Sequence, residues 1–481
     1  MPPGAQLRRE VIATAAQLRW LATHRSAEFP FLLDSAARGA GSGAGNSAAA
    51  LGRYSMLLGP PQGMLLLRGD GRLECQGTRC SGSSFLGAFD QWWAQERTAG
   101  TQPDAGDALP FRGGWALYLA YELAAQIESG LEMPTLDRDA VCAVALRVRA
   151  AAIYDHERQR CELIAEPGAG QQLQFLHSAL AAAPQPAHEP AAELAAAPGT
   201  KAAQPGAALV EQQEDHYRDI VLRAQQYIAA GDIYQANLSR GWQLQLVGQA
   251  DAAELYESLR RANPAPFAAF ATLPGLRVLS SSPERLVRVS DGRVETRPIA
   301  GTRPRSGAHG ADALEQSQLL ANPKERAEHV MLIDLERNDL GRICQAGSVE
   351  VSEFMVTESY RHVHHIVSNV RGRLREGITP GQVLGAVFPG GTITGCPKYR
   401  CMQIIGELEG EARGAYTGSL GYVNLDGSMD LNILIRTATL TGTTLEFRAG
   451  AGIVADSDWQ RELAETRAKA QGMVRAFGGA S

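Results

Sequence analysis

Charged side chains crowd into residues 323–342, whose sequence is PKERAEHVMLIDLERNDLGR. Glu325 and Glu328 are three positions apart, so on a helix they share one face and can converge on one cation. A carboxylate that enters an apolar run such as residues 330–333 is costly to bury unless it is paired or holds a metal. On its own this stretch is typical of a surface helix with ion pairs, and the metal interpretation depends on the segments that accompany it.

Four other segments carry residue types that could do chemistry. Glu284 follows an alternating, strand-like stretch, and the glycines of residues 388–398 can turn backbone N–H groups toward an anion. Glu462, Glu465 and Lys469 are spaced i, i+3 and i+7, so on a helix they form one polar stripe. The segments are SSPER (281–285), RPIAGTR (297–303), FPGGTITGCPK (388–398) and the C-terminal helical stretch (462–477).

Each segment also has a simpler interpretation. Glu284 can pair with Arg285, and the polar stripe can be a solvated helix face. The glycine-rich segment lacks the GxxxxGK[ST] spacing of a phosphate-binding loop, so a nucleotide site is not predicted. Taken one at a time, the simpler interpretations are favoured.

Length and composition limit the class of protein. A chain of 481 residues predicts two or more domains, and its formal net charge of −6, spread over interspersed acidic and basic residues, does not suit nucleic-acid binding. Seven cysteines without a CxxC pair favour a reducing compartment over a disulfide framework. Residues 1–20 make a poor signal peptide and no apolar run reaches membrane-spanning length, so we expect a cytoplasmic protein without a membrane partner.

The elements that must position these residues can be predicted in outline. In the N-terminal part, residues 29–34 and 54–58 predict paired strands, and the Ala, Gly and Ser residues of 38–52 predict a mobile loop between them. Residues 109–125 predict a turn that leads into a helix, and residues 143–154 predict a strand.

The C-terminal part has a more regular pattern. Residues 217–228 keep helical spacing up to Gly231, residues 242–246 alternate as a strand, and a second helix ends at residues 263–264. Hairpin turns are predicted at residues 291–292, 426–427 and 441–443. Many antiparallel strands mixed with long helices predict an α+β fold.

Residues 181–210 are almost entirely Ala, Pro, Gln, Gly and Glu, and such a segment cannot bury enough surface to offset its ordering entropy. We interpret it as a linker between an N-terminal domain, residues 1–180, and a catalytic domain, residues 211–481.

Taken together, the motifs resemble those of one enzyme family. SPER, PIAGT, KERAEHVMLIDL, HVHHIVS, FPGGTITGCPK, IRT, and AGAGIVADS followed by ExxETxxK occur here in one order. This series resembles the chorismate-utilising enzymes, which include anthranilate synthase component I, aminodeoxychorismate synthase component I, isochorismate synthase and salicylate synthase. The resemblance is dense over residues 214–477 and looser before them, where LPFRGG and the pair LLDS and RYS still match. It implies antiparallel sheets in a sandwich-like core flanked by helices.

The resemblance implies a metal site and two groups near the reacting ring. It assigns Mg²⁺ to Glu328 and Glu465, with Glu462 close by, and hard oxygen ligands suit this ion. Glu284 matches the general acid that protonates the departing C4 hydroxyl of chorismate, and His365 matches a histidine near the ring. Six further positions match those that bind the substrate: Thr392, Gly395, Tyr416, Arg436, Gly452 and Lys469.

The resemblance also separates water from ammonia as the attacking molecule. Family members that add water use a lysine as base where this chain has Gln235, and an amide cannot take a proton from water at neutral pH. Isochorismate and salicylate synthesis are therefore disfavoured. The chain has no GxCxG segment of a glutamine amidotransferase, so ammonia is expected from a separate amidotransferase subunit or as free ammonia.

Two amination products remain open. LPFRGG, APFAAF and ITG favour aminodeoxychorismate synthase component I, a transferase that makes 4-amino-4-deoxychorismate for p-aminobenzoate and folate, and Asp34 in LLDS predicts weak or no feedback by tryptophan. Ala300 opposes this, because it replaces the lysine of PIKGT that acts as nucleophile in well-studied members. The alternatives are anthranilate synthase component I, for tryptophan, and a non-catalytic relative that binds a chorismate-like ligand or scaffolds an amidotransferase.

Overall fold

The computed structural model describes most of the chain, with gaps. The described residues are 6–37, 40–41, 52–78, 82–97, 109–185, 208–248, 251–304, 312, 315, 317, 321–359 and 363–478.

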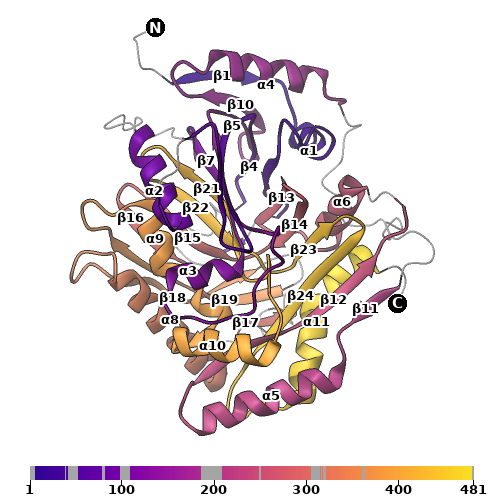
Figure 1. Cartoon of the computed structure of the whole chain (residues 1–481), viewed down its shortest axis with the longest axis vertical. Coiled ribbons are helices and arrows are strands. Elements are labelled where there is room, and N and C mark those ends of the chain that lie inside the picture. The colour runs from indigo at the N-terminus through magenta and orange to yellow at the C-terminus, as the bar shows by residue number, and fades with distance from the viewer. Residues whose placement is uncertain are drawn as a thin grey trace.

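Two antiparallel sheets form the centre of the molecule (Figure 1). Along the first sheet the strands are β1 (Leu7–Val11), β10 (Arg160–Ala165), β9 (Ala150–Asp155), β4 (Tyr54–Leu58), β2 (Phe31–Asp34), β13 (Phe267–Leu273), β14 (Leu276–Ser282), β23 (Thr437–Thr441), β24 (Thr444–Ile453), β12 (Gln235–Gln245) and β11 (Leu209–Glu211), with β20 (Gly395–Cys396) paired to β12. Along the second they are β3 (Ala40–Gly41), β18 (Glu350–Ser359), β19 (Val363–Arg373), β16 (Arg293–Thr296), β15 (Arg285–Ser290), β22 (Met429–Ile433), β21 (Ser419–Asn424), β7 (Gly114–Leu119), β8 (Val141–Val148), β5 (Pro61–Arg68) and β6 (Leu73–Gln76), with β17 (Ile299–Pro304) paired to β19.

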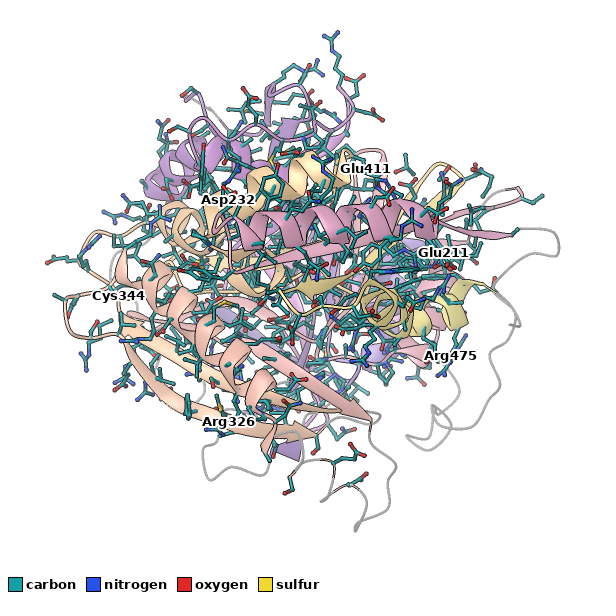
Figure 2. All side chains as sticks on the ribbon, turned by 90° about the horizontal axis from the view of Figure 1, so that it is seen from below. Glu211, Asp232, Arg326, Cys344, Glu411 and Arg475 are labelled. Carbon is teal, nitrogen blue, oxygen red and sulfur yellow. The ribbon has the colours of Figure 1, made fainter. Side chains whose placement is uncertain are left out.

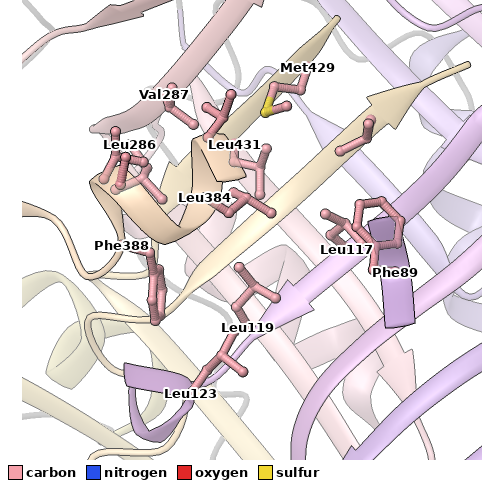
Figure 3. Packing of buried hydrophobic residues seen from close by; sticks show 14 of the residues in the cluster. Phe89, Leu117, Leu119, Leu123, Leu286, Val287, Leu384, Phe388, Met429 and Leu431 are labelled. Carbon is pink, nitrogen blue, oxygen red and sulfur yellow. The ribbon is translucent and has the colours of Figure 1, made fainter. Parts of the chain in front are cut away.

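Helices cover the outer faces of both sheets, so the predicted α+β class is confirmed. Buried residues of α1 (Ala15–His24), α6 (Ala252–Ala262) and α11 (Trp459–Phe477) pack on the first sheet, and those of α2 (Phe85–Glu96), α8 (Pro323–Gly341) and α9 (Pro380–Val387) pack on the second. A third cluster, which includes Phe31, Tyr118, Val144 and Ala269, lies between the two sheets. Figure 3 shows part of the outer layer of the second sheet, where Phe89, Leu384 and Phe388 face the strands.

Strands from both halves of the chain are neighbours in both sheets. In the first sheet β2 pairs with β13, so that Leu32 lies opposite Phe270. In the second β7 pairs with β21, so that Leu117 lies opposite Gly421. The two halves therefore share their sheets and their cores. Most of the proposed linker, residues 186–207, lies outside the described residues, and the domain boundaries stay a prediction.

Most local predictions are confirmed. Strands β2 and β4 pair as expected, α5 (Glu214–Ala229) ends just before Gly231, and α6 ends at Ala262. The hairpin turn between Val289 and Val294 has φ of 53° at Asp291 and 70° at Gly292, the left-handed values that such a turn requires. The two later hairpins join β21 to β22 and β23 to β24.

The helix predicted within residues 109–125 is wrong. Residues 114–119 form β7, and only the short turn Tyr121–Leu123 and α3 (Ala124–Ile127) follow. All six residues of β7 are buried between β21 and β8, because pairing on both edges and packing on both faces override the local pattern. The single strand predicted over residues 143–154 is two strands, β8 and β9, and they belong to different sheets.

The structure also bears on two smaller predictions, which concern a loop and the cysteines. The loop predicted for residues 38–52 lies almost wholly outside the described residues, where only residues 40–41 and 52 are placed. Cys75 is disulfide-bonded, which the sequence analysis did not predict, whereas Cys142, Cys161, Cys344, Cys396 and Cys401 are free. Among the described helices, none is long and apolar enough to cross a membrane.

Candidate active site

Glu284 lies where the chain passes from the first sheet to the second, between the end of β14 and the start of β15. Its side chain is buried, with 5 % exposure. Thr392 Oγ1 donates a hydrogen bond of 2.9 Å to Glu284 Oε1, and the backbone N–H of Ile299 donates a longer one of 3.4 Å to the same oxygen. The junction of the two sheets therefore holds one carboxyl group in a fixed position.

Burial raises the pKa of Glu284 to about 7, although the hydrogen bonds from Thr392 and Ile299 and the charges of Lys469 and Arg436 oppose that rise. A carboxyl group with such a pKa carries a proton for much of the time near neutral pH. It can therefore donate that proton to a leaving group, as the general acid of an enzyme does.

The glycine-rich segment places Thr392. A Cβ on Gly391 would lie 2.7 Å from Leu335 Cδ2, and one on Gly390 would lie 2.8 Å from Ile433 Cδ1, so a larger residue at either position would have to displace these side chains of α8 and β22. Gly395 has φ of 140°, and a Cβ there would overlap the carbonyl oxygen of Gln235. Close packing accounts for these glycines. It brings the hydroxyl of Thr392 to Glu284.

Gln235 and Gly452 meet on neighbouring strands. β12 pairs with β24, and a Cβ on Gly452 would overlap Gln235 Nε2. The Gln235 side chain is buried, and its Oε1 has no hydrogen-bond partner among the described residues. Gln235, which stands where water-adding family members are expected to have a lysine base, therefore lies against Gly452, a predicted substrate-binding position.

Of the predicted carboxylate-binding residues, Tyr416 and Lys469 lie near Gly450 of β24, and Arg436 lies beside β14. Tyr416 is buried, which raises its pKa to about 12, and its hydroxyl is hydrogen-bonded to the Asn237 side chain. Lys469 Nζ donates to the carbonyl oxygen of Gly450 at 3.0 Å. Arg436 has φ of 51°, and its carbonyl oxygen accepts from Ser281 N at 3.0 Å, so its backbone lies beside the strand that leads to Glu284.

His365 and Ala300 lie on neighbouring strands of the second sheet. His365 is buried on β19, and its neighbour Ile366 pairs with Ala300 of β17. Ala300 directly follows Ile299, whose backbone N–H donates to Glu284, so the backbone of Ala300 lies one residue from that hydrogen bond.

The predicted metal ligands are on two helices, Glu328 on α8 and Glu462 and Glu465 on α11. Within the described ranges there is no group of three or more His, Cys, Asp or Glu side chains placed to hold a metal ion. Glu465 Oε1 is instead 2.7 Å from Lys469 Nζ. The donors have the oxygen chemistry that Mg²⁺ prefers, but the three carboxylates are not gathered into one ligand set.

Two buried charge clusters next to the site were missed by the sequence analysis. One contains Glu336 and Asp339 of α8, with Lys398 paired to Asp339. The other is centred on Arg413 and Glu409, which are 2.7 Å apart. Their signal in the sequence was weak, because charged residues at helical spacing are usually exposed and only burial marks these as different.

A buried carboxyl group with a pKa of about 7 at the junction of two antiparallel sheets, with the charges of Lys469 and Arg436 acting on it, suits an enzyme that acts on a small anionic molecule. The chain belongs to the family of chorismate binding enzymes, whose family model matches residues 70–475.

Individual relatives carry two different names. The chain is 38 % identical over 429 residues to an anthranilate synthase component I-like protein of Synechocystis sp., covering 89 % of this chain and 84 % of that protein. It is 38 % identical over 403 residues to aminodeoxychorismate synthase component 1 of Bacillus subtilis, covering 82 % of each chain. The crystal structure of anthranilate synthase component I from Streptococcus pneumoniae superposes with a TM-score of 0.73 at 30 % identity, over 88 % of this chain and 92 % of that one. The chain is thus a chorismate-utilising enzyme of the anthranilate synthase and aminodeoxychorismate synthase family.

Proposed function

We propose that this chain is component I of an aminodeoxychorismate synthase. It converts chorismate and ammonia to 4-amino-4-deoxychorismate and water, and the product serves p-aminobenzoate and folate synthesis. The observation that carries the amination of chorismate is the buried Glu284, whose pKa of about 7 keeps a proton available beside Thr392, and the choice of product rests on the LPFRGG, APFAAF and ITG segments. The reaction needs such a group, because hydroxide is a poor leaving group and must depart as water.

In the proposed reaction Glu284 gives its proton to the C4 oxygen of chorismate, the C4–O bond breaks, and water departs. Ammonia forms the new C4–N bond, and the proton that it loses returns to the carboxylate of Glu284. The enolpyruvyl group stays on the ring. Lys469 and Arg436, whose charges act on Glu284, are the cations that bind the carboxylates of the substrate.

Mg²⁺ is the proposed cofactor on the basis of the motifs: Glu328 and Glu465, with Glu462 close by, are the oxygen donors that would hold it, although the described structure does not gather the three carboxylates into one ligand set. When bound, the ion would neutralise a substrate carboxylate and draw electron density from the ring. Lys469 Nζ lies 2.7 Å from Glu465 Oε1, so it brings a positive charge next to one of these carboxylates.

Ammonia is proposed to come from a glutamine amidotransferase subunit. The buried amide of Gln235 cannot act as the base that water requires, whereas ammonia is itself a nucleophile. The label "component I" carried by the relatives supports a second subunit.

Anthranilate synthesis is the second candidate, and Ala300 favours it. Alanine cannot attack C2, so ammonia would add directly at C2, the C4 hydroxyl would leave, and pyruvate would then be lost from the ring. Anthranilate synthase component 1 of Aquifex aeolicus is 49 % identical over 264 residues, which are 55 % of this chain and 53 % of that one.

The deciding experiment is product identification by mass spectrometry. Purified protein is incubated with chorismate, MgCl₂ and ammonium chloride at pH 8, without any lyase. A product of the mass of 4-amino-4-deoxychorismate supports the proposal, whereas fluorescent anthranilate with release of pyruvate overturns it in favour of the second candidate. Glu284→Gln is the control for both products, since either reaction expels the C4 hydroxyl.

A further inference from the structure

Arg413 is the centre of a buried polar network that joins several segments of the candidate site. The residue lies in the loop between α10 (Lys398–Glu409) and β21, and its side chain is almost completely buried. Its guanidinium group lies over the ring of Tyr121 on one side, at 4.8 Å, and near the ring of Tyr416, at 5.5 Å. A planar cation between two aromatic rings is held in one orientation.

The nitrogens of Arg413 donate to three different parts of the chain. Nη2 donates to the carbonyl oxygen of Asn237 at 2.6 Å, two residues after Gln235. Nη1 donates to the carbonyl oxygen of Ile393 at 3.3 Å, directly after Thr392, and also to Thr417 Oγ1 at 3.3 Å. One side chain therefore touches the neighbours of Gln235, Thr392 and Tyr416.

The charge of Arg413 is balanced inside the protein. Glu409 accepts from Arg413 Nε at 2.9 Å and from Nη2 at 2.7 Å, and it also accepts from the backbone N–H of Ser239 at 2.8 Å. Burial would raise the pKa of Glu409, but the charges of Arg413 and Arg448 lower it below its usual value, so Glu409 stays ionised. The pair can thus remain charged without contact with water.

The N-terminal half of the chain holds the same loop from the other side. Glu122 is buried, and its Oε1 accepts from the backbone N–H of Arg413 at 2.6 Å, while its Oε2 accepts from Gly414 N at 3.2 Å. Three residues later the chain reaches Tyr416. The orientation of the Tyr416 ring is therefore set from both halves of the chain.

We propose that Arg413, with Glu409 and Glu122 as its supports, is the positioning residue that holds Tyr416 and the Thr392 segment in the arrangement that receives the carboxylates of the substrate. Arg413 acts through its neighbours and does not itself touch the substrate. This inference rests on the proposed function, because it assumes that Tyr416 and Thr392 contact chorismate.

An alternative explanation is that Arg413 only stabilises the fold, and a matched arginine separates the two roles. Arg147 is equally buried, pairs with Glu166 through two hydrogen bonds of 2.6 and 2.7 Å, and lies 4.9 Å over the ring of Trp115. It contacts none of the candidate site residues in these interactions. Arg147→Lys therefore carries the same chemical change in the same kind of environment.

The test compares Arg413→Lys, Arg147→Lys, Tyr416→Phe and the double variant Arg413→Lys/Tyr416→Phe. Lysine keeps the charge but cannot reach Asn237, Ile393 and Glu409 together. We expect Arg413→Lys to raise the KM for chorismate and the calorimetric Kd by about tenfold, with a smaller change in kcat. We expect Arg147→Lys to lower Tm without changing KM. In the Tyr416→Phe background the added effect of Arg413→Lys should shrink to about twofold, because coupled residues are not additive.

An unchanged KM and Kd in folded Arg413→Lys would overturn the inference, and so would fully additive effects in the double variant. If Arg413→Lys does not fold, Glu122→Gln takes its place: its amide N–H₂ would face the N–H of Gly414, so KM should rise about threefold, and an unchanged KM would again overturn the inference. If the wild type and the variants bind chorismate equally well, only this inference is refuted. Wild-type protein that neither binds nor converts chorismate refutes the proposed function as well.

Discussion

Thr392 and Glu284 are 108 positions apart in the chain and are joined by a hydrogen bond of 2.9 Å from Oγ1 to Oε1. The bond links the glycine-rich segment after α9 to the junction between the two sheets. It stabilises the ionised form of Glu284, whereas burial stabilises the protonated form more strongly, and the balance leaves the pKa at about 7.

Removing the acid itself should abolish most of the activity. Glu284→Gln keeps the shape and the hydrogen bond to Thr392 but has no acidic proton. We expect kcat to fall by about 10²- to 10⁴-fold with a small change in KM, since general acid catalysis contributes that much. Steady-state kinetics with chorismate and ammonium chloride measures this. A variant with more than half of the wild-type kcat would show that another group protonates the leaving oxygen.

The pH profile should follow Glu284. Because the protonated form is active and its pKa is about 7, kcat should be level at lower pH and fall about tenfold per unit at higher pH. Thr392→Val removes a hydrogen bond that lowers this pKa, so the falling limb should move to higher pH. The profile is measured as kcat between pH 5.5 and 9 at saturating chorismate, and each value is divided by the concentration of free NH₃, because most of the added ammonium is protonated over this range. A limb that stays in place in the variant would mean that a different group titrates.

The metal should be required and should depend on both helices. Treatment with EDTA should abolish turnover and added MgCl₂ should restore it. Glu328→Gln and Glu465→Gln should each raise the MgCl₂ concentration needed for half-maximal activity by at least about tenfold. Titration of activity against MgCl₂ measures this. Glu407→Gln is the matched control, because Glu407 is an exposed glutamate paired with Arg223 on another helix. Full activity of Glu328→Gln in chelator would contradict the proposed Mg²⁺ site.

The buried cluster of Glu336 and Asp339 should make the stability of the protein depend on pH. Burial, and then the charge of Asp339, raise the pKa of Glu336 to about 7, above its value in the unfolded chain. A group of this kind contributes stability below its unfolded pKa of about 4.5, and that contribution is lost as the pH rises through 7. Glu336→Gln, which cannot ionise, should therefore raise Tm at pH 8 and have little effect at pH 5.

Differential scanning calorimetry at the two pH values measures this effect, and we expect about 1–3 kcal/mol at pH 8. Asp334→Asn is the control, since Asp334 lies on the same helix but is exposed and paired with Arg337. An equal effect of Glu336→Gln at pH 5 and pH 8 would show that packing, and not ionisation, is responsible.

Charged residues at the surface of this chain say less about its function than the buried ones do. Figure 2 shows α5 between Glu211 and Asp232, and α8 between Arg326 and Cys344. Glu211 pairs with Arg467, and both side chains are partly exposed. Exposed pairs of this kind add at most about 1 kcal/mol each. The charged residues that matter for the site are the few that the two sheets bury.

Local features of the fold were predictable from the sequence. Helical spacing and the glycine that ends α5, the turn residues at 291–292, and the alternation in β12 depend on interactions between residues close together in the chain. The motifs likewise identified Glu284, Thr392, Tyr416 and Lys469 as candidates, because residue type and order survive in the sequence itself.

Tertiary structure alone decided how those residues are used. The strand β7, predicted as part of a helix, takes its form from β21, which lies about 300 residues further along the chain, and no local pattern contains that pairing. The pKa of Glu284 and the role of Arg413 depend on burial, and burial is produced when segments far apart in sequence pack together. Local preferences amount to about 1 kcal/mol per residue, whereas burying a charge or a large apolar side chain costs or gains several times more, so packing decides wherever the two disagree.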